Sequence, residues 1–218
     1  MVKANGPTGR AADRDTEQRI IEAAHAVFIR RGTAGARTQD IAEEAGVNKA
    51  LIHYYFRSKE RLAEVVFQRA GLRLLPPLFA ILGSDAELEE KVERAIEHYL
   101  TGLLEAPYLP GYLLSEMNHH PERLPRLVEG VTGAPAAGFA NRVLAGLAAQ
   151  IHERVESGAM RPITAEQFVM NLVSLCLFPF AARPLFTLAF DWSGDDFHAC
   201  IAERRRDLSG FFMAGLRP

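Results

Sequence analysis

The chain has 218 residues, of which 48% are hydrophobic and 24% are charged, and its formal net charge is −2. This length provides for a buried core in one large domain, or in a small domain and a larger one. Two cysteines are too few for a disulfide framework, and the polar N-terminus lacks the apolar segment of a signal peptide. We therefore expect a cytoplasmic protein.

Charge is unevenly distributed along the chain. Residues 1–70 contain 12 Lys and Arg against 9 Asp and Glu, whereas residues 71–218 contain 13 against 18. A mildly basic first third on an acidic remainder is consistent with one module that faces nucleic acid. The polar stretch 1–15 precedes the first apolar pattern, and we predict that it is a flexible arm.

Helical spacing of apolar residues begins directly after this arm. Ile20, Ala24 and Phe28 form one stripe of a helix predicted over residues 16–31, and Gly32 suits the left-handed position that ends a helix. No segment of the chain shows sustained strand alternation, so the predicted fold class is all-α.

A second helix is predicted to begin with Thr38 as its N-cap and to bury Ile41, Ala42 and Ala45. Gly46 then turns the chain. Two short helices joined by such a turn define a helix-turn-helix, whose second helix can lie in a groove of DNA.

The third and fourth helices follow without a linker. Asn48 is predicted to cap the third helix, which ends near Phe56. Ser58 is predicted to cap a fourth helix, which two prolines interrupt after Leu75. This organisation places a three-helix DNA-binding domain at residues 16–62.

The rest of the chain, residues 63–218, is predicted to be a helical bundle for ligand binding and dimerisation. Ser84 followed by Glu87 has the pattern of a capping box that opens a helix. The bundle helices are predicted over residues 84–104, 111–118, 136–156, 164–182 and 195–216.

The helix that begins at Thr164 is apolar on nearly every side, so something must cover all of it. The final helix carries an apolar stripe as well, with Phe211 included in it. We predict that a second copy of the chain covers these helices, and the alternative is a monomer whose own helices do so. The predicted dimer interface consists of Phe168, Leu172, Leu175, Phe197, Ile201, Leu208 and Phe212.

The helix-turn-helix segment has fixed residue types at fixed spacing. They are Thr38, Ile41 with Ala42, Ala45 to Val47, Tyr55 with Phe56, and Ser58 to Glu60. Together with the helix before it, this segment resembles the TetR family of bacterial regulators over residues 16–70. Beyond residue 70 the resemblance rests only on the number and order of the helices.

The resemblance implies DNA contacts for particular residues. Thr38 and the N-terminus of its helix suit one phosphate and Lys59 another, whereas Gln and Lys side chains can read adenine and guanine. His53 stands where family members usually have Tyr, so an imidazole would make that phosphate contact. The predicted DNA-binding residues are Arg37, Thr38, Gln39, Asn48, Lys49, Ala50, His53, Tyr54, Tyr55 and Lys59.

The resemblance also implies a ligand pocket in the second domain. Asn171 and Ser174 lie on one face of an apolar helix, where they either bond neighbouring backbone or point into a cavity. Aromatic residues such as Tyr99 either line that cavity or belong to the core. The predicted ligand-binding residues are Tyr99, Tyr112, Glu116, Asn141, Asn171, Ser174 and Phe178.

These features predict a homodimeric transcriptional regulator, a repressor by family habit, that a small-molecule effector releases from a palindromic operator in double-stranded DNA. The alternative is an architectural DNA-binding protein that does not switch. We expect no enzymatic activity, metal or cofactor, because no nucleophile-elbow motif is present and adjacent His119 and His120 diverge on a helix. Polar residues and prolines within 168–190 argue against a membrane span.

Overall fold

The computed structural model describes residues 7–218, with side chains described from residue 13 onward except at 139, 140 and 143. Within this part the chain forms eleven helices and no strand, which confirms the all-α prediction. The helices are α1 Pro7–Gly35, α2 Thr38–Ala45, α3 Lys49–Phe56, α4 Lys59–Leu82, α5 Leu88–Glu105, α6 Leu109–His119, α7 Arg123–Thr132, α8 Phe139–Glu156, α9 Ala165–Ala181, α10 Arg183–Phe190 and α11 Gly194–Ala214.

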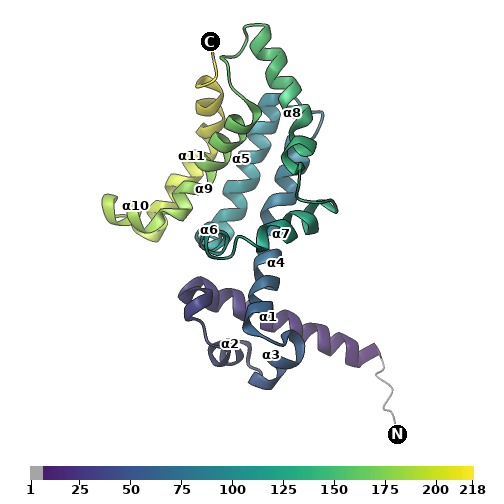
Figure 1. Ribbon diagram of the computed structural model, residues 1–218. Coiled ribbons are helices and arrows are strands. Elements are labelled where there is room, and N and C mark those ends of the chain that lie inside the picture. Colours follow the sequence, from purple (N-terminus) through teal and green to yellow (C-terminus); the bar gives the residue numbers. More distant parts are fainter. Residues whose placement is uncertain (1–6) are drawn as a thin grey trace.

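The molecule has a small head and a larger body (Figure 1). The helices α1, α2 and α3 form the head, and α4 rises from it into the body, where it packs against α5 and α7. Helix α5 packs against both α9 and α11 in the upper body, while α6 contacts α1 and α4 at the junction. Helix α10 projects sideways from the bundle.

The predicted arm is shorter than expected. Residues 1–6 lie outside the described part, but from Pro7 the chain is already helical, so the prediction of an arm over residues 1–15 is wrong from residue 7 onward. Proline suits a first helical position because its φ is preset and its missing N–H is not needed there. The extended helix also has a tertiary contact, since Tyr55 donates its hydroxyl to the Asp13 carboxylate at 2.8 Å.

Two capping predictions are wrong by small shifts. The N-cap of α2 is Arg37, so Thr38 is its first helical residue, and the Asp40 carboxylate accepts the Arg37 backbone N–H at 3.2 Å. In the body, α5 begins at Leu88 with no side-chain cap, because the Ser84 hydroxyl instead donates to the Ile81 carbonyl at the end of α4.

The prediction that prolines end the fourth helix is also wrong. Helix α4 continues through Pro76 and Pro77 to Leu82. Each proline removes one backbone hydrogen bond, yet its fixed φ is compatible with a helix. Leu74, Leu78 and Leu82 are buried on both sides of the prolines, and this shared apolar stripe holds the two halves in line.

The predicted interface residues on α9 and α11 lie in the core of a single chain. Six of the seven are buried there and Leu175 is half-buried, so they cannot supply the surface that a second copy would contact. Phe211, by contrast, is 68% exposed and does not belong to the buried stripe. The six buried residues of the predicted interface are Phe168, Leu172, Phe197, Ile201, Leu208 and Phe212.

The sequence pattern did not anticipate α10, whose residues 183–190 follow α9 directly.

Two segments of the described chain are long and apolar enough to cross a membrane by length and composition. One is α4, and the other is α9 together with α10, which are bent by 63° relative to each other. Helix α4 packs against α1, α5 and α7 in this fold. Core helices pass the same test, so this finding is weak evidence for a span.

Candidate nucleic-acid interface

The turn between α2 and α3 is built on Gly46. Its φ of 62° and ψ of 38° are left-handed, a conformation that favours glycine. The Arg19 guanidinium of α1 donates to the Ala45 carbonyl at 2.6 Å and so fixes the turn against the first helix. A Cβ at Gly46 would lie 3.3 Å from that guanidinium. The predicted role of Gly46 is therefore confirmed.

Helix α3 divides its residues between the core and one exposed face. The Asn48 side chain caps it by accepting the Ala50 N–H at 2.8 Å, as predicted. Ile52 and Phe56 are buried. The opposite face exposes side chains that can reach a neighbouring molecule: Lys49, Ala50, His53 and Tyr54.

A hollow of about 310 Å³ lies where α3 meets the start of α2 and of α4. Five of the ten predicted DNA-binding residues line it, drawn from three different elements, so the fold brings these separate parts of the motif together. These five are Thr38, Lys49, Ala50, His53 and Lys59.

Two of the three acidic residues of α2 are neutralised within the head. Arg31 pairs with Asp40 at 2.5 Å, and Arg30 pairs with Glu44 at 2.6 Å. These contacts fasten α2 to α1 and reduce the negative charge beside the hollow. A hollow that is lined by Lys49 and Arg57 and lies at the N-termini of two helices is suited to phosphate.

Arg57 is a lining residue that sequence reasoning missed. It follows α3, lines the hollow and has a φ of 67°, which is unusual for a residue with a side chain. Its position between the aromatic end of the recognition helix and the Ser58 cap is the signal that could have identified it. The strained backbone places this cation on the same hollow that Lys49 lines.

Lys59 has a different role from the predicted phosphate contact. Its ammonium group donates to the carbonyl oxygens of Thr33, Ala34 and Ala36 at 3.0, 3.4 and 3.1 Å. These three bonds use all three N–H groups of the side chain. Lys59 therefore holds the end of α1 and the loop before α2 against the start of α4, and its charge is already engaged within the protein.

The predicted DNA-binding residues outside the hollow differ in exposure and in their hydrogen-bond partners. Tyr55 is half-buried and bonded to Asp13, which raises the pKa of its phenol and occupies its hydroxyl. Gln39 is exposed and donates to Glu43 at 2.9 Å, while Arg37 is exposed at the start of α2. Tyr54 is 61% exposed and stands edge-on to Tyr55.

The predicted ligand-binding residues do not gather around one cavity. Asn141, Asn171, Ser174 and Phe178 are exposed, and the last three lie on the outer face of their helix. The cavity interpretation of Asn171 and Ser174 is therefore wrong. The three others are buried. Tyr99 lies in the core beside Cys176. Burial raises the pKa of the Cys176 thiol to about 12.

Tyr112 and Glu116 belong to a polar cluster at the junction of head and body. The Glu116 carboxylate accepts the Thr33 hydroxyl from the head and forms an ion pair with Arg123 of α7. Glu116, Thr33 and Arg123 are all buried. A buried ion pair needs such additional hydrogen bonds to be tolerated, so the cluster fixes α6 and α7 against the end of α1.

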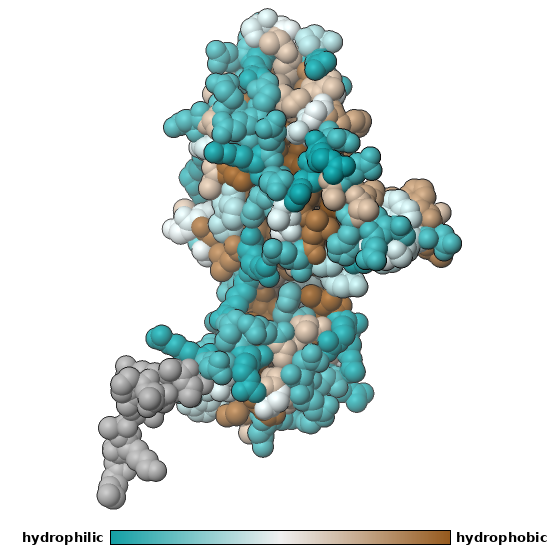
Figure 2. Space-filling view, turned by 180° about the vertical axis from the view of Figure 1, so that it is seen from behind, coloured by the Kyte–Doolittle hydropathy of each residue, from teal (hydrophilic) through white to brown (hydrophobic). Residues whose placement is uncertain are grey.

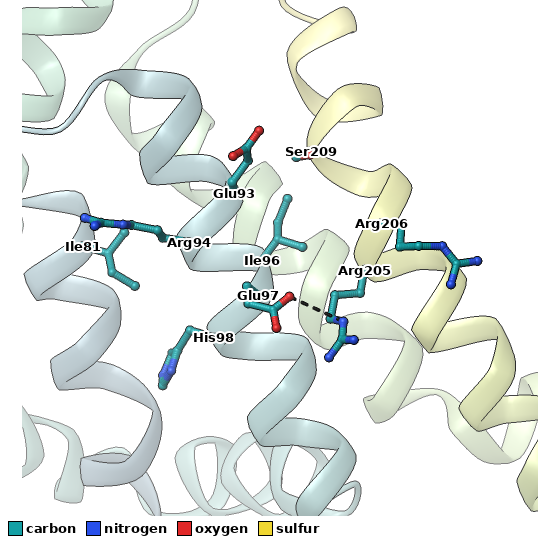
Figure 3. A pocket seen from close by; sticks show the side chains of 9 residues that line it. All are labelled: Ile81, Glu93, Arg94, Ile96, Glu97, His98, Arg205, Arg206 and Ser209. Atoms are coloured by element: carbon teal, nitrogen blue, oxygen red, sulfur yellow. Dashed lines mark ion pairs between the residues drawn. The ribbon is translucent and has the colours of Figure 1, made fainter.

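A hollow of about 680 Å³ in the body lies between α4, α5 and α11. Figure 3 shows that its charged side chains spread apart, with Arg206 pointing away from Arg94 and Glu93. The Arg205 guanidinium pairs with Glu97 at 3.4 Å. This surface groove lacks the convergent polar groups of a built ligand pocket.

Comparison with known proteins agrees with the geometry of the head. Residues 20–66 match the sequence model of the family described as bacterial regulatory proteins, tetR family. The chain is 33% identical over 112 residues to the HTH-type transcriptional repressor SCO4008 of Streptomyces coelicolor, covering 50% of this chain and 57% of that one. It is 30% identical over 123 residues to the HTH-type transcriptional repressor Rv3405c of Mycobacterium tuberculosis, covering 56% and 59%.

The fold also resembles solved structures. The chain of SCO4942 from Streptomyces coelicolor superposes with a TM-score of 0.63 over 93% of this chain and 99% of that one, at 21% identity. This likeness supports the arrangement of head and body. The sequence matches, in contrast, span less than two thirds of the curated relatives' length.

The fold and its exposed α3 face define a helix-turn-helix protein with a helical second domain. The N-terminal domain belongs to the family described as bacterial regulatory proteins, tetR family, as the match over residues 20–66 shows. The family description names regulatory proteins, and the relatives SCO4008 and Rv3405c are named as transcriptional repressors. Among the described residues, no three His, Cys, Asp or Glu side chains are grouped to hold a metal ion.

Proposed function

We propose that this protein is a DNA-binding transcriptional repressor that acts in the cytoplasm, where bacterial DNA lies. The observation that supports this most is the hollow of the head, where Thr38 of α2 and Lys49 and His53 of α3 meet. Helix α3 would lie in the major groove, with Lys49 and Arg57 close to phosphates or guanine and Gln39 close to bases.

We further propose a homodimer, formed through the outer faces of α9, α10 and α11. Large apolar side chains are exposed on these helices, and Leu188 is 82% exposed. Figure 2 shows the projecting α10 region from behind, with hydrophobic residues on its surface. An exposed apolar surface of this kind marks an interaction site. The side chains are Met170, Phe178, Leu185, Leu188, Phe190 and Phe211.

A dimer of this kind would bind a palindromic operator, because two-fold symmetry in the protein matches two-fold symmetry in the half-sites. The buried cluster at the junction supplies a route from body to head. Glu116 of α6 holds the Thr33 hydroxyl, and the Thr33 carbonyl accepts from Lys59 at the start of α4. A small molecule that moves α6 would therefore change the position of the recognition helices and release the operator.

Selection of bound sequences from a random DNA pool by the full chain tests this proposal at physiological salt. We expect an enriched palindrome with two half-sites. A shallow preference between selected and random DNA would contradict specific regulation and favour an architectural protein that does not switch.

A further inference from the structure

A second hollow lies at the junction of head and body, between α1, α4 and α6. Its volume is about 190 Å³, and its apolar walls include Ile21, Val66 and Leu109. A dry cavity of about 150 Å³ is large enough to hold benzene. The hollow therefore has room for one small ring-sized molecule and not for a polymer.

The polar side of this hollow is cationic. Arg69 and Arg73 of α4 line it together with Glu22 of α1, which gives these side chains a formal charge of +1. Glu22 already accepts a hydrogen bond from Gln18 at 2.6 Å. Arg73 has only a loose partner outside the hollow, Glu105 at 3.5 Å, and both of those side chains are mostly exposed. An anion in the hollow would replace that weak contact.

His25 of α1 also lines the hollow, and its Nε2 atom is buried without a hydrogen-bond partner. Its ring stands edge-on to Tyr112 of α6, with ring centroids 5.9 Å apart. Burial, and then the charge of Arg73, lower the pKa of His25, so the ring is neutral in the free protein at pH 7. A buried polar atom without a partner is unfavourable, and a bound acceptor would relieve this through an Nε2–H tautomer.

We propose that this hollow binds a small aromatic carboxylate of about the size of benzoate. The ring lies against Ile21, Val66 and Leu109, and the carboxylate is held by Arg69, Arg73 and the His25 imidazole. Such a ligand touches the first helix of the head and two helices of the junction at once. Its effect on DNA binding, which rests on the proposed function, follows because it favours one angle between head and body.

Benzoate titrated into the DNA-free full chain tests the site directly. We expect the side-chain NMR signal of His25, assigned by its loss in His25→Gln, to move on titration. The signal of His152 should stay in place, because this histidine lines a different hollow, beside α9, that shares no residue with the proposed site. The neutral isostere benzamide should bind at least about tenfold more weakly, since it lacks the charge.

Arg73→Gln should weaken benzoate binding by about tenfold or more, because it removes a charge-assisted hydrogen bond from an exposed side chain. The matched control is Arg94→Gln, an exposed arginine of the 680 Å³ groove, which should bind benzoate as the wild type does. An unmoved His25 signal at about 10 mM benzoate, or equal binding of benzamide, overturns the proposed site.

The proposed effect of benzoate on DNA binding is tested separately from benzoate binding itself. If benzoate binds at His25 but the affinity for the selected DNA stays the same, the proposed coupling between the hollow and DNA binding is overturned. Failure of the proposed function would instead appear without benzoate, as a free protein that does not discriminate between DNA sequences. The two failures are therefore distinguishable.

Discussion

The head and the body of this protein use charge in different ways. In the head, the acidic residues Asp40 and Glu44 are paired with arginines of α1, while Lys49 and Arg57 are exposed around an open hollow. In the body, the most strongly buried charged pair, Glu116 with Arg123, lies at the junction. The head thus presents charge to a partner, whereas the junction uses charge to fix its own helices.

The largest effect is expected where charge is buried. Arg123→Ala leaves the Glu116 carboxylate buried without its ion-pair partner, and we expect a loss of about 3–5 kcal/mol in the free energy of unfolding. Urea denaturation measures it. The control is Arg126→Ala on the same helix, whose exposed guanidinium pairs with Glu64 while Arg61 remains as a second partner. Equal losses for both variants would contradict the distinction.

The apolar residues of the body sharpen the comparison in the same way. Phe168→Ala should lower the free energy of unfolding by about 3–5 kcal/mol, because its ring is buried within one chain.

Leu188→Ser should leave the monomer as stable as before and weaken self-association, since its side chain is exposed on α10. Sedimentation measures the association. Dimerisation that Leu188→Ser leaves intact would place the interface elsewhere.

Two lysines of the head separate internal from external roles. Lys59→Ala removes three hydrogen bonds to backbone carbonyls, and we expect it to destabilise the head by about 1.5–3 kcal/mol. Lys49→Ala should leave stability unchanged and reduce the salt dependence of DNA binding by about one unit of slope. The reverse pattern, with the slope lowered only by Lys59→Ala, would restore Lys59 as the phosphate contact.

A smaller effect is expected from the pH dependence of stability. The Arg126 guanidinium, with further help from Arg61, holds the pKa of Glu64 below its usual range. A depressed pKa stabilises the fold above the pKa of the unfolded chain, and this contribution is lost as the pH falls through the folded value. When the pH is lowered below about 4, the free energy of unfolding should therefore fall less in Glu64→Gln than in the wild type, because glutamine does not titrate. Parallel pH profiles of the two proteins would contradict this.

The head was more predictable than the body, for a physical reason. Gly46, Asn48 and Ser58 act locally, through a left-handed turn and two caps, so their roles follow from neighbouring residues alone. The direction of Lys59 depends on Thr33 and Ala36, which are more than twenty residues away in the chain. No local pattern contains that contact.

In the body, residue type alone could not separate core from surface. Phe168 and Phe178 lie on the same apolar helix, yet one is fully buried and the other is 57% exposed. The ring of Phe168 packs edge-on against Phe212 of α11, whereas Phe178 contacts Phe186 of the projecting α10, and the pattern of α9 contains neither neighbour. For the same reason Asn171 and Ser174 were compatible with a cavity until the outer face of α9 was known.

Hydrogen exchange of the full chain, with and without the DNA duplex that it selects, tests the central claim most directly. The account predicts that DNA slows exchange of the backbone amides at the start of α2 and along α3, around Thr38, Lys49 and His53, and leaves α5 unchanged. Protection confined to the body, with α3 exchanging as in the free protein, would contradict the assignment of this face to DNA.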